Sequence, residues 1–253
     1  MKHSRPGQVH LVAGRNAVLE ALRAGRRFLE VLVDEQARPQ EKLGQITALA
    51  GQQGVATRPV PRAELDRLCP GLPHQGVVGR AAPVLAPSLA QVLEQCWQQG
   101  RDPCLVLLRQ VSFQHNLGAV LRTADACGVS AVVVPSQQGA ALGTQAVRVA
   151  MGASEHVPVL RQSLLAAAAV LRRAGLRLVA ADSDQGRPPW DTDLTGPLAL
   201  VLGGEHAGVS DPLRTRCHEL VRVPLQGHVT SLNVSVACGM LLYERLRQEG
   251  KAR

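Results

Sequence analysis

From residue 104 onward, short runs of apolar residues recur between longer stretches of helical periodicity. Runs such as CLVLL from Cys104 and LALVL from Leu198 contain no polar side chain, which is typical of strands buried on both faces. Because these strands alternate with helices, the pattern predicts a parallel sheet covered by helices on both sides. The expected strands are 104–108, 131–135, 176–181, 198–202 and 220–223, and the expected helices are 118–127, 164–174 and 231–247.

The first 83 residues form a separate pattern of short alternating elements. We expect a small α/β domain here, followed by a linker around the Ala-Pro-rich stretch 82–87 and a helix over 89–98. The domains are therefore predicted as 1–83, a linker and connecting helix over 84–100, and a main domain over 101–253. Within the first domain the expected helices are 17–24, 41–50 and 62–68, and the expected strands are 28–33, 55–60 and 77–81.

Positive charge is concentrated in the smaller domain. Residues 1–83 carry 12 Lys/Arg against 7 Asp/Glu, a net +5 of the whole chain's +8. Such an excess fits a surface that faces RNA phosphates, and an ordinary solvated surface is the alternative. Aromatic residues make up only 2% of the chain, so few side chains can stack on RNA bases. RNA contacts would therefore depend on arginine. The candidate arginines are Arg5, Arg15, Arg23, Arg26, Arg27, Arg58 and Arg62.

The cysteines indicate a reducing compartment. Six cysteines show no CxxC pair and no regular spacing, and several lie within apolar runs, so we expect reduced core residues. Cys217 and His218 are adjacent, but without a second ligand pair they do not make a metal site, and no metal is expected. The chain shows neither a signal sequence nor an apolar run long enough to span a membrane, which favours a cytoplasmic protein.

One stretch, VRVPLQGHVTSLNVSVACGMLLYE over 221–244, combines a loop with a long apolar helix. A strand-like VRV ends at Pro224, a loop carries Gly227 and Thr230, and Ser231 or Asn233 can cap the helix that follows. Free backbone N–H groups at the start of a helix suit a small polar ligand. This stretch therefore predicts a ligand site.

Two further loops follow predicted strands of the same sheet. In SFQHNLGAVLRTADACG, Asn116 can cap a helix that carries Arg122, and in LVLGGEHAGVS three glycines flank Glu205. Each loop alone is weak evidence, because helix caps and glycine turns are common. Since parallel strands present their carboxyl ends at one edge, the three loops together favour one binding site. Neither of the glycine motifs of nucleotide-binding loops, GxxxxGK[ST] and GxGxxG, occurs.

The motifs NLGAVLRTA, LVLGGEHAGVS and VPLQGHVTSLNVSVACGMLLYE resemble the three ordered motifs of the SpoU (TrmH) branch of the SPOUT RNA methyltransferases. In the small domain, HLVAGRNAVLEAL and LPHQGVVG are similar to the substrate-binding domain of ribosomal protein L30e type. The resemblance implies RNA 2′-O-ribose methylation with S-adenosylmethionine as cofactor. It also implies a C-terminal parallel-sheet SPOUT domain with a deep trefoil knot, and a homodimer. The nearest subgroup methylates a guanosine of 23S rRNA.

The resemblance also assigns roles to residues of this sequence. Arg122 matches the arginine to which the family assigns activation of the ribose hydroxyl. Because the pKa of arginine exceeds 12, we expect it instead to bind the adjacent phosphate and stabilise the developing alkoxide. Asn116 would fix its position, and Glu205 and Asn233 would complete the polar frame. The implied cofactor contacts are Leu202, Gly203, Gly208, Val223, Leu225, Ser231 and Leu232, and the expected RNA contacts are Arg15, Asn16, Arg26 and Arg27.

The first motif departs from the family pattern. Family members usually carry an aspartate early in this loop and an Asp-Pro pair before His-Asn, where this chain has RQVSFQ over 109–114. His206 stands where the family usually has glycine. Three readings follow: an rRNA methyltransferase, which leads, a tRNA ribose methyltransferase, and a non-catalytic RNA-binding or ribosome-assembly factor. Asn116 and Arg122 are retained, which favours an enzyme.

Overall fold

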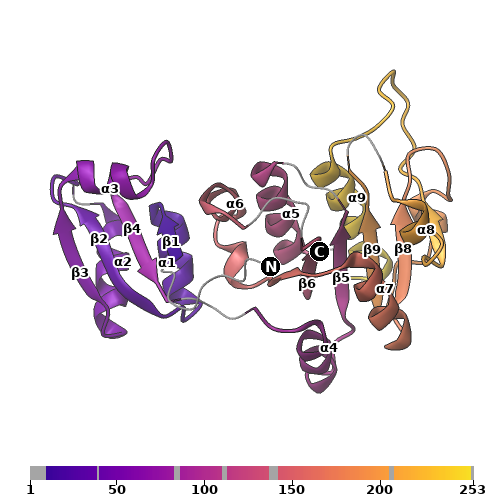
Figure 1. Cartoon of the computed structure of the whole chain (residues 1–253), viewed down its shortest axis with the longest axis horizontal. Coiled ribbons are helices and arrows are strands. Elements are labelled where there is room, and N and C mark those ends of the chain that lie inside the picture. The colour runs from indigo at the N-terminus through magenta and orange to yellow at the C-terminus, as the bar shows by residue number, and fades with distance from the viewer. Residues whose placement is uncertain are drawn as a thin grey trace. The chain divides into compact units, whose positions relative to one another are not determined.

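The computed structural model describes residues 10–38, 40–82, 86–109, 113–136, 142–204 and 208–251. Their contacts divide into two compact units, drawn with element labels in Figure 1. One unit holds the described residues up to 82 together with Leu142–His156, and the other holds the remainder. The predicted division into 1–83, 84–100 and 101–253 remains a prediction.

The smaller unit is built on a four-stranded sheet in the order β1-β4-β2-β3. β4 runs antiparallel to β1 and β2, whereas β2 and β3 are parallel. Its core contains Val31 of β2 and Ile46 of α2, both fully buried. The elements are β1 (His10–Ala13), α1 (Arg15–Arg23), β2 (Phe28–Asp34), α2 (Glu41–Gln52), β3 (Ala56–Val60), α3 (Arg62–Leu68) and β4 (Val77–Ala81).

The larger unit contains a six-stranded, wholly parallel sheet in the order β10-β8-β9-β5-β6-β7. The predicted parallel α/β fold is therefore confirmed. Both central strands, β5 (Cys104–Leu108) and β9 (Leu198–Leu202), are buried along their whole length. The outer strands are β6 (Ala131–Val134), β7 (Val159–Arg161), β8 (Arg177–Ala181) and β10 (Glu219–Val221).

Helices cover this sheet and position its loops. α4 (Leu89–Gln98) begins at a capping box made by Ser88 and Gln91, and α7 (Leu164–Arg173) is capped by Ser163. α5 (Gln114–Ala126) packs against α9 (Val234–Gln248). The short helix α8 (Asp211–Arg214) lies between β9 and β10 in sequence.

Several elements begin elsewhere than expected or were not predicted. α5 starts at Gln114 rather than 118, and α9 starts at Val234 rather than 231. β1, β7, α8 and α6 (Thr144–Ala150), which have three to seven residues, were not predicted. α6 contacts β1 and therefore groups with the smaller unit. Among the described residues, no helix combines the length and apolarity needed to cross a bilayer.

Candidate functional site

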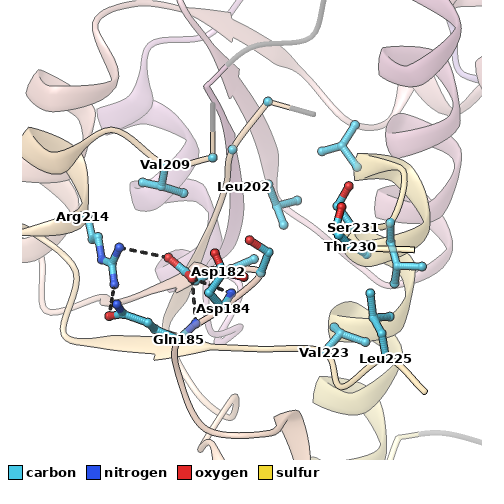
Figure 2. Close-up of a pocket in the computed structure, with 18 residues that line it drawn as sticks. Asp182, Asp184, Gln185, Leu202, Val209, Arg214, Val223, Leu225, Thr230 and Ser231 are labelled. Atoms are coloured by element: carbon cyan, nitrogen blue, oxygen red, sulfur yellow. Dashed lines mark hydrogen bonds and ion pairs between the residues drawn. The ribbon is translucent and has the colours of Figure 1, made fainter. Parts of the chain in front are cut away.

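A cavity of about 380 Å³ lies at the carboxyl ends of β8 and β9 (Figure 2). Its volume falls in the roughly 300–1,000 Å³ range of small-molecule sites. Four segments form its walls: the loop after β8, the glycine loop after β9, helix α8 and the chain that leads into α9. The lining residues are Ala181, Asp182, Ser183, Asp184, Gln185, Leu202, Gly203, Gly204, Gly208, Val209, Arg214, Val223, Leu225, Thr230, Ser231, Leu232, Val234 and Ala237.

All seven residues predicted to hold the cofactor line this cavity. They come from two loops separated by the whole of α8 and β10, so the sheet topology brings them together. The seven are Leu202, Gly203, Gly208, Val223, Leu225, Ser231 and Leu232. Glu205 and His206, the other predicted residues of the glycine loop, lie outside the described residues.

The glycine loop closes on itself at the cavity wall. The Gly208 N–H donates to the Gly204 carbonyl at 3.2 Å, and Gly208 has a left-handed φ of 53°. A Cβ atom on Gly203 would lie 2.1 Å from the Gly208 carbonyl carbon, so the two backbones can approach this closely only because residue 203 has no side chain. Arg109, the residue after β5, contacts this loop, and its Nη1 donates to the Gly208 carbonyl at 2.9 Å.

A fourth loop, 182–185 after β8, was not predicted as part of the site. The Asp182 carboxylate accepts the backbone N–H groups of Asp184 at 2.9 Å and Gln185 at 2.8 Å, and pairs with Arg214 of α8 at 3.2 Å. Its sequence signal, an Asp-Ser-Asp-Gln-Gly run directly after an apolar strand, is equally typical of a simple turn. Only the fold shows that this turn faces the glycine loop.

Two predicted catalytic residues meet between the starts of α5 and α9. The Asn233 Nδ2 donates to the Asn116 Oδ1 at 3.2 Å, and the Asn233 Oδ1 accepts the Ser235 N–H at 2.9 Å. Asn233 is thus the N-cap of α9, one of the two caps predicted. The predicted capping role of Asn116 is wrong, because α5 begins at Gln114 and Asn116 lies buried in its first turn.

Arg122 lies apart from Asn116. It is exposed on α5, does not line the cavity, and shows no hydrogen bond to Asn116 in the described part of the chain. Six residues along an α-helix give about 240° of rotation and about 9 Å of rise, so the two side chains leave α5 on different faces. The expectation that Asn116 fixes Arg122 is therefore wrong for this conformation. Gln110, Val111 and Ser112 of the altered loop lie outside the described residues.

The predicted RNA contacts in the smaller unit differ in their accessibility. Arg15 donates from Nε to the Gln75 carbonyl at 2.8 Å, and Asn16 accepts from the Lys42 Nζ at 2.7 Å. Arg27 is exposed. Arg26, in contrast, pairs with Glu155 and has a side chain only 12% exposed, so its charge is already partnered.

The cysteines and histidines that the structure describes supply no further site. Five of the six free cysteines are buried, and burial raises the pKa of both Cys104 and Cys217 to about 11, which keeps them as neutral thiols. The His218 Nδ1 accepts the Leu178 N–H at 2.9 Å, which fixes the ring in the sheet. His115 and His228 are exposed. No group of three or more metal-ligating side chains occurs among the described residues.

Comparison with known proteins assigns the family. Residues 103–243 match the SpoU rRNA Methylase family. The chain belongs to this family. Residues 11–85 match a second family, RNA 2′-O ribose methyltransferase substrate binding, so the SpoU domain is preceded by a substrate-binding domain.

Relatives of this SpoU protein match it over nearly its whole length. It is 38% identical to the 23S rRNA (guanosine-2′-O-)-methyltransferase RlmB of Escherichia coli, over 94% of this chain and 98% of the relative. It is 37% identical to RlmB of Vibrio cholerae, over 92% and 93%. The SpoU methyltransferase AviRb from Streptomyces viridochromogenes, solved in complex with the cofactor AdoMet, superposes with a TM-score of 0.81 at 25% identity, over 97% of this chain and 92% of that one.

Proposed function

We propose that this chain is an S-adenosylmethionine-dependent 2′-O-ribose methyltransferase that acts on a guanosine of 23S rRNA. The observation that carries the proposal is the cavity at the ends of β8 and β9, where the family's second and third motifs meet. Family membership and the names of the RlmB relatives support the reaction and the substrate.

The cavity suits S-adenosylmethionine in size and in chemistry. At its glycine wall, Gly203, Gly204 and Gly208 have no side chain, so a ligand can approach the main chain closely. Leu202, Val223, Leu225 and Leu232 add apolar surface for the adenine ring, and Ser231 adds a hydroxyl. Bound there, the cofactor would supply an electrophilic methyl group on its sulfonium sulfur.

The RNA-facing side chains must orient the ribose 2′-hydroxyl and assist its reaction. A ribose 2′-hydroxyl is a poor nucleophile, so it must be held in line with the methyl group while its proton is lost. We assign Arg122 to the adjacent phosphate and to the developing alkoxide, since a guanidinium donates without losing its own proton. Asn116 and Asn233, joined by a 3.2 Å hydrogen bond, form a polar frame at the start of α9. Glu205, which lies outside the described residues, is the third residue that we assign to this role.

The smaller unit would hold the RNA. Arg15, Asn16 and Arg27 are the contacts we propose from its surface, and the match to a substrate-binding family over 11–85 supports this role. Arg26 contributes only if its pair with Glu155 opens. We further propose the L30e type for this unit and the domain limits of 1–83, 84–100 and 101–253.

We also propose a homodimer formed through α9. Val236, Met240 and Tyr243 lie on one exposed face of this helix, at 50%, 49% and 60% exposure, while Leu241 and Leu242 are buried. An apolar stripe of this kind on a helix fits a second copy of the same chain. Arg122 is exposed on α5, which packs against α9. We also propose that the larger unit contains a deep trefoil knot and that the protein is cytoplasmic.

Transfer of a labelled methyl group tests the function. The purified protein, labelled S-adenosylmethionine and unmodified 23S rRNA should give label at one nucleotide, in a dinucleotide that resists alkaline hydrolysis because its 2′-oxygen is blocked. Asn116→Ala and Arg122→Ala should abolish labelling while cofactor binding persists. If only tRNA became labelled, the substrate would be tRNA rather than 23S rRNA. If the protein bound RNA but neither bound the cofactor nor transferred a methyl group, it would be a non-catalytic assembly factor.

A further inference from the structure

We propose that the ion pair between Arg214 and Asp182 is a positioning device that holds the 182–185 loop as one wall of the cofactor cavity. This role rests on the proposed function, because it concerns the same cavity. Neither residue lies in the three sequence motifs, and the fold brings the two together.

Asp182 organises the loop from within. One carboxylate oxygen, Oδ1, accepts the N–H groups of Asp184 and Gln185 at 2.9 and 2.8 Å, and the other, Oδ2, forms an ion pair with the Arg214 Nη1 at 3.2 Å. The Arg214 Nη2 also donates to the Gln185 Oε1 (Figure 2). The guanidinium thus binds both the residue that shapes the turn and the residue that ends it.

Arg214 joins two walls that are far apart in sequence. It belongs to α8, which follows the glycine loop, whereas Asp182 directly follows β8. Arg214 and Gln185 line the cofactor cavity and also a neighbouring cavity that contains His218 and Glu219. Arg214 and Gln185 therefore form part of the partition between the two cavities. Loss of the ion pair between Arg214 and Asp182 would let the loop move toward the second cavity.

Little else holds the middle of this loop. Its first residue is fixed by the Asp182 N–H, which donates to the Val221 carbonyl at 2.9 Å. Beyond its end, the Arg187 N–H donates to the Leu220 carbonyl at 3.1 Å, next to Gly186, whose left-handed φ is 118°. Ser183 and Asp184 are exposed, so apolar packing does not fix their positions. The charged network is what keeps the loop against the cavity before a ligand arrives.

The larger unit contains a second pair with the same chemistry and a different location. Asp193 pairs through Oδ2 with Arg177 at 2.6 Å and accepts the Thr195 N–H through Oδ1 at 2.9 Å. This pair does not line the cofactor cavity. If removing any Arg–Asp pair from a turn weakens cofactor binding, variants of both pairs will bind the cofactor less tightly. If the Arg214–Asp182 pair positions the loop, only the variants of that pair will bind it less tightly.

The test compares four variants of the full chain: Arg214→Gln, Asp182→Asn, Arg177→Gln and Asp193→Asn. S-adenosylmethionine binding is measured by calorimetry, thermal unfolding gives stability, and methyl transfer gives kcat and KM. We expect Kd to rise about tenfold in the first two variants, the size expected when a few side chains are immobilised on binding rather than beforehand. At saturating cofactor, kcat should stay within about twofold, because the pair does not touch the reacting atoms. The two control variants should keep the Kd of the unaltered protein.

Two further results separate the possible explanations. The double variant Arg214→Gln/Asp182→Asn should bind no worse than either single variant, because both remove one shared network. Fully additive effects, or equal rises in Kd in the Arg177 and Asp193 variants, would overturn the positioning role. If the unaltered protein binds the cofactor and all four variants bind it equally, only this inference fails. If the unaltered protein does not bind S-adenosylmethionine, the proposed function itself fails.

Discussion

The close contact between Gly203 and Gly208 makes Gly203→Ala the sharpest perturbation of the cavity. A Cβ at position 203 would lie 2.1 Å from the Gly208 carbonyl carbon, 2.4 Å from its oxygen and 2.5 Å from its Cα. Carbon atoms pack at about 3.5 Å or more, so the Gly208 backbone must retreat by about 1.4 Å, that is 3.5 minus 2.1. A shift of this size would also disrupt the 2.9 Å hydrogen bond from Arg109 to the Gly208 carbonyl.

The energetic cost should be that of forcing a methyl group into a packed site, about 1–3 kcal/mol. In a unit of this size that corresponds to a fall in Tm of roughly 2–4 °C per kcal/mol. Because Gly203, Gly204 and Gly208 line the cavity, the displaced wall should also raise the Kd for S-adenosylmethionine by about tenfold or more.

Calorimetric titration and thermal unfolding of Gly203→Ala measure both effects. Gly227→Ala is the matched control, because Gly227 lies between Leu225 and Thr230 of the same site and an added Cβ there meets no atom within 4 Å. The control should keep the Kd and Tm of the unaltered protein. If Gly203→Ala also leaves both unchanged, the tight pairing of the two glycines does not shape the cavity and the reasoning is wrong.

Three other predictions concern different parts of the molecule. Asn233→Ala should destabilise α9 by about 0.5–2 kcal/mol through loss of its cap, whereas Asn233→Ser should keep most of that stability. Both should lose methyl transfer, because both remove the 3.2 Å bond to Asn116, and activity in the serine variant would contradict the polar frame. Gly79→Ala would place a Cβ 2.2 Å from the Phe28 Cε1, so RNA affinity and the stability of the smaller unit should fall while cofactor binding persists, and unaltered RNA affinity would count against that unit as the RNA platform. Burial raises the pKa of Cys104 from 9.0 to about 11, so its neutral thiol stabilises the fold below pH 9 and this contribution is lost as pH rises toward 11. Chemical denaturation across that range should show a smaller loss of stability for Cys104→Val than for the unaltered protein, and equal losses would refute the assignment.

The sequence predicted the buried strands and the convergence of three loops, of which the second and third line the cavity. β5 and β9 have the predicted limits because their residues are wholly apolar and fit only the centre of a parallel sheet. The seven residues expected at the cofactor share one cavity because parallel strands end at the same edge.

Other features could not be read from the sequence, for physical reasons. The 182–185 loop has turn chemistry that many surface loops share, and its proposed role depends on a contact with Arg214, which is 32 residues away in the sequence. Arg26 was a surface candidate by charge, yet it pairs with Glu155, which is 129 residues away. Asn116 fits a helix cap in sequence, but α5 starts two residues earlier at Gln114. The contacts of Arg214 and Arg26 are tertiary contacts, which local sequence patterns do not show.

The most direct test of the central claim is a map of 2′-O-methyl groups in rRNA and tRNA from cells with and without this gene. We predict the loss of a single 2′-O-methylguanosine from 23S rRNA, restored by the unaltered gene and not by a gene that carries Arg122→Ala. An unchanged methylation pattern in both RNAs would contradict the assignment of this chain as a 2′-O-ribose methyltransferase.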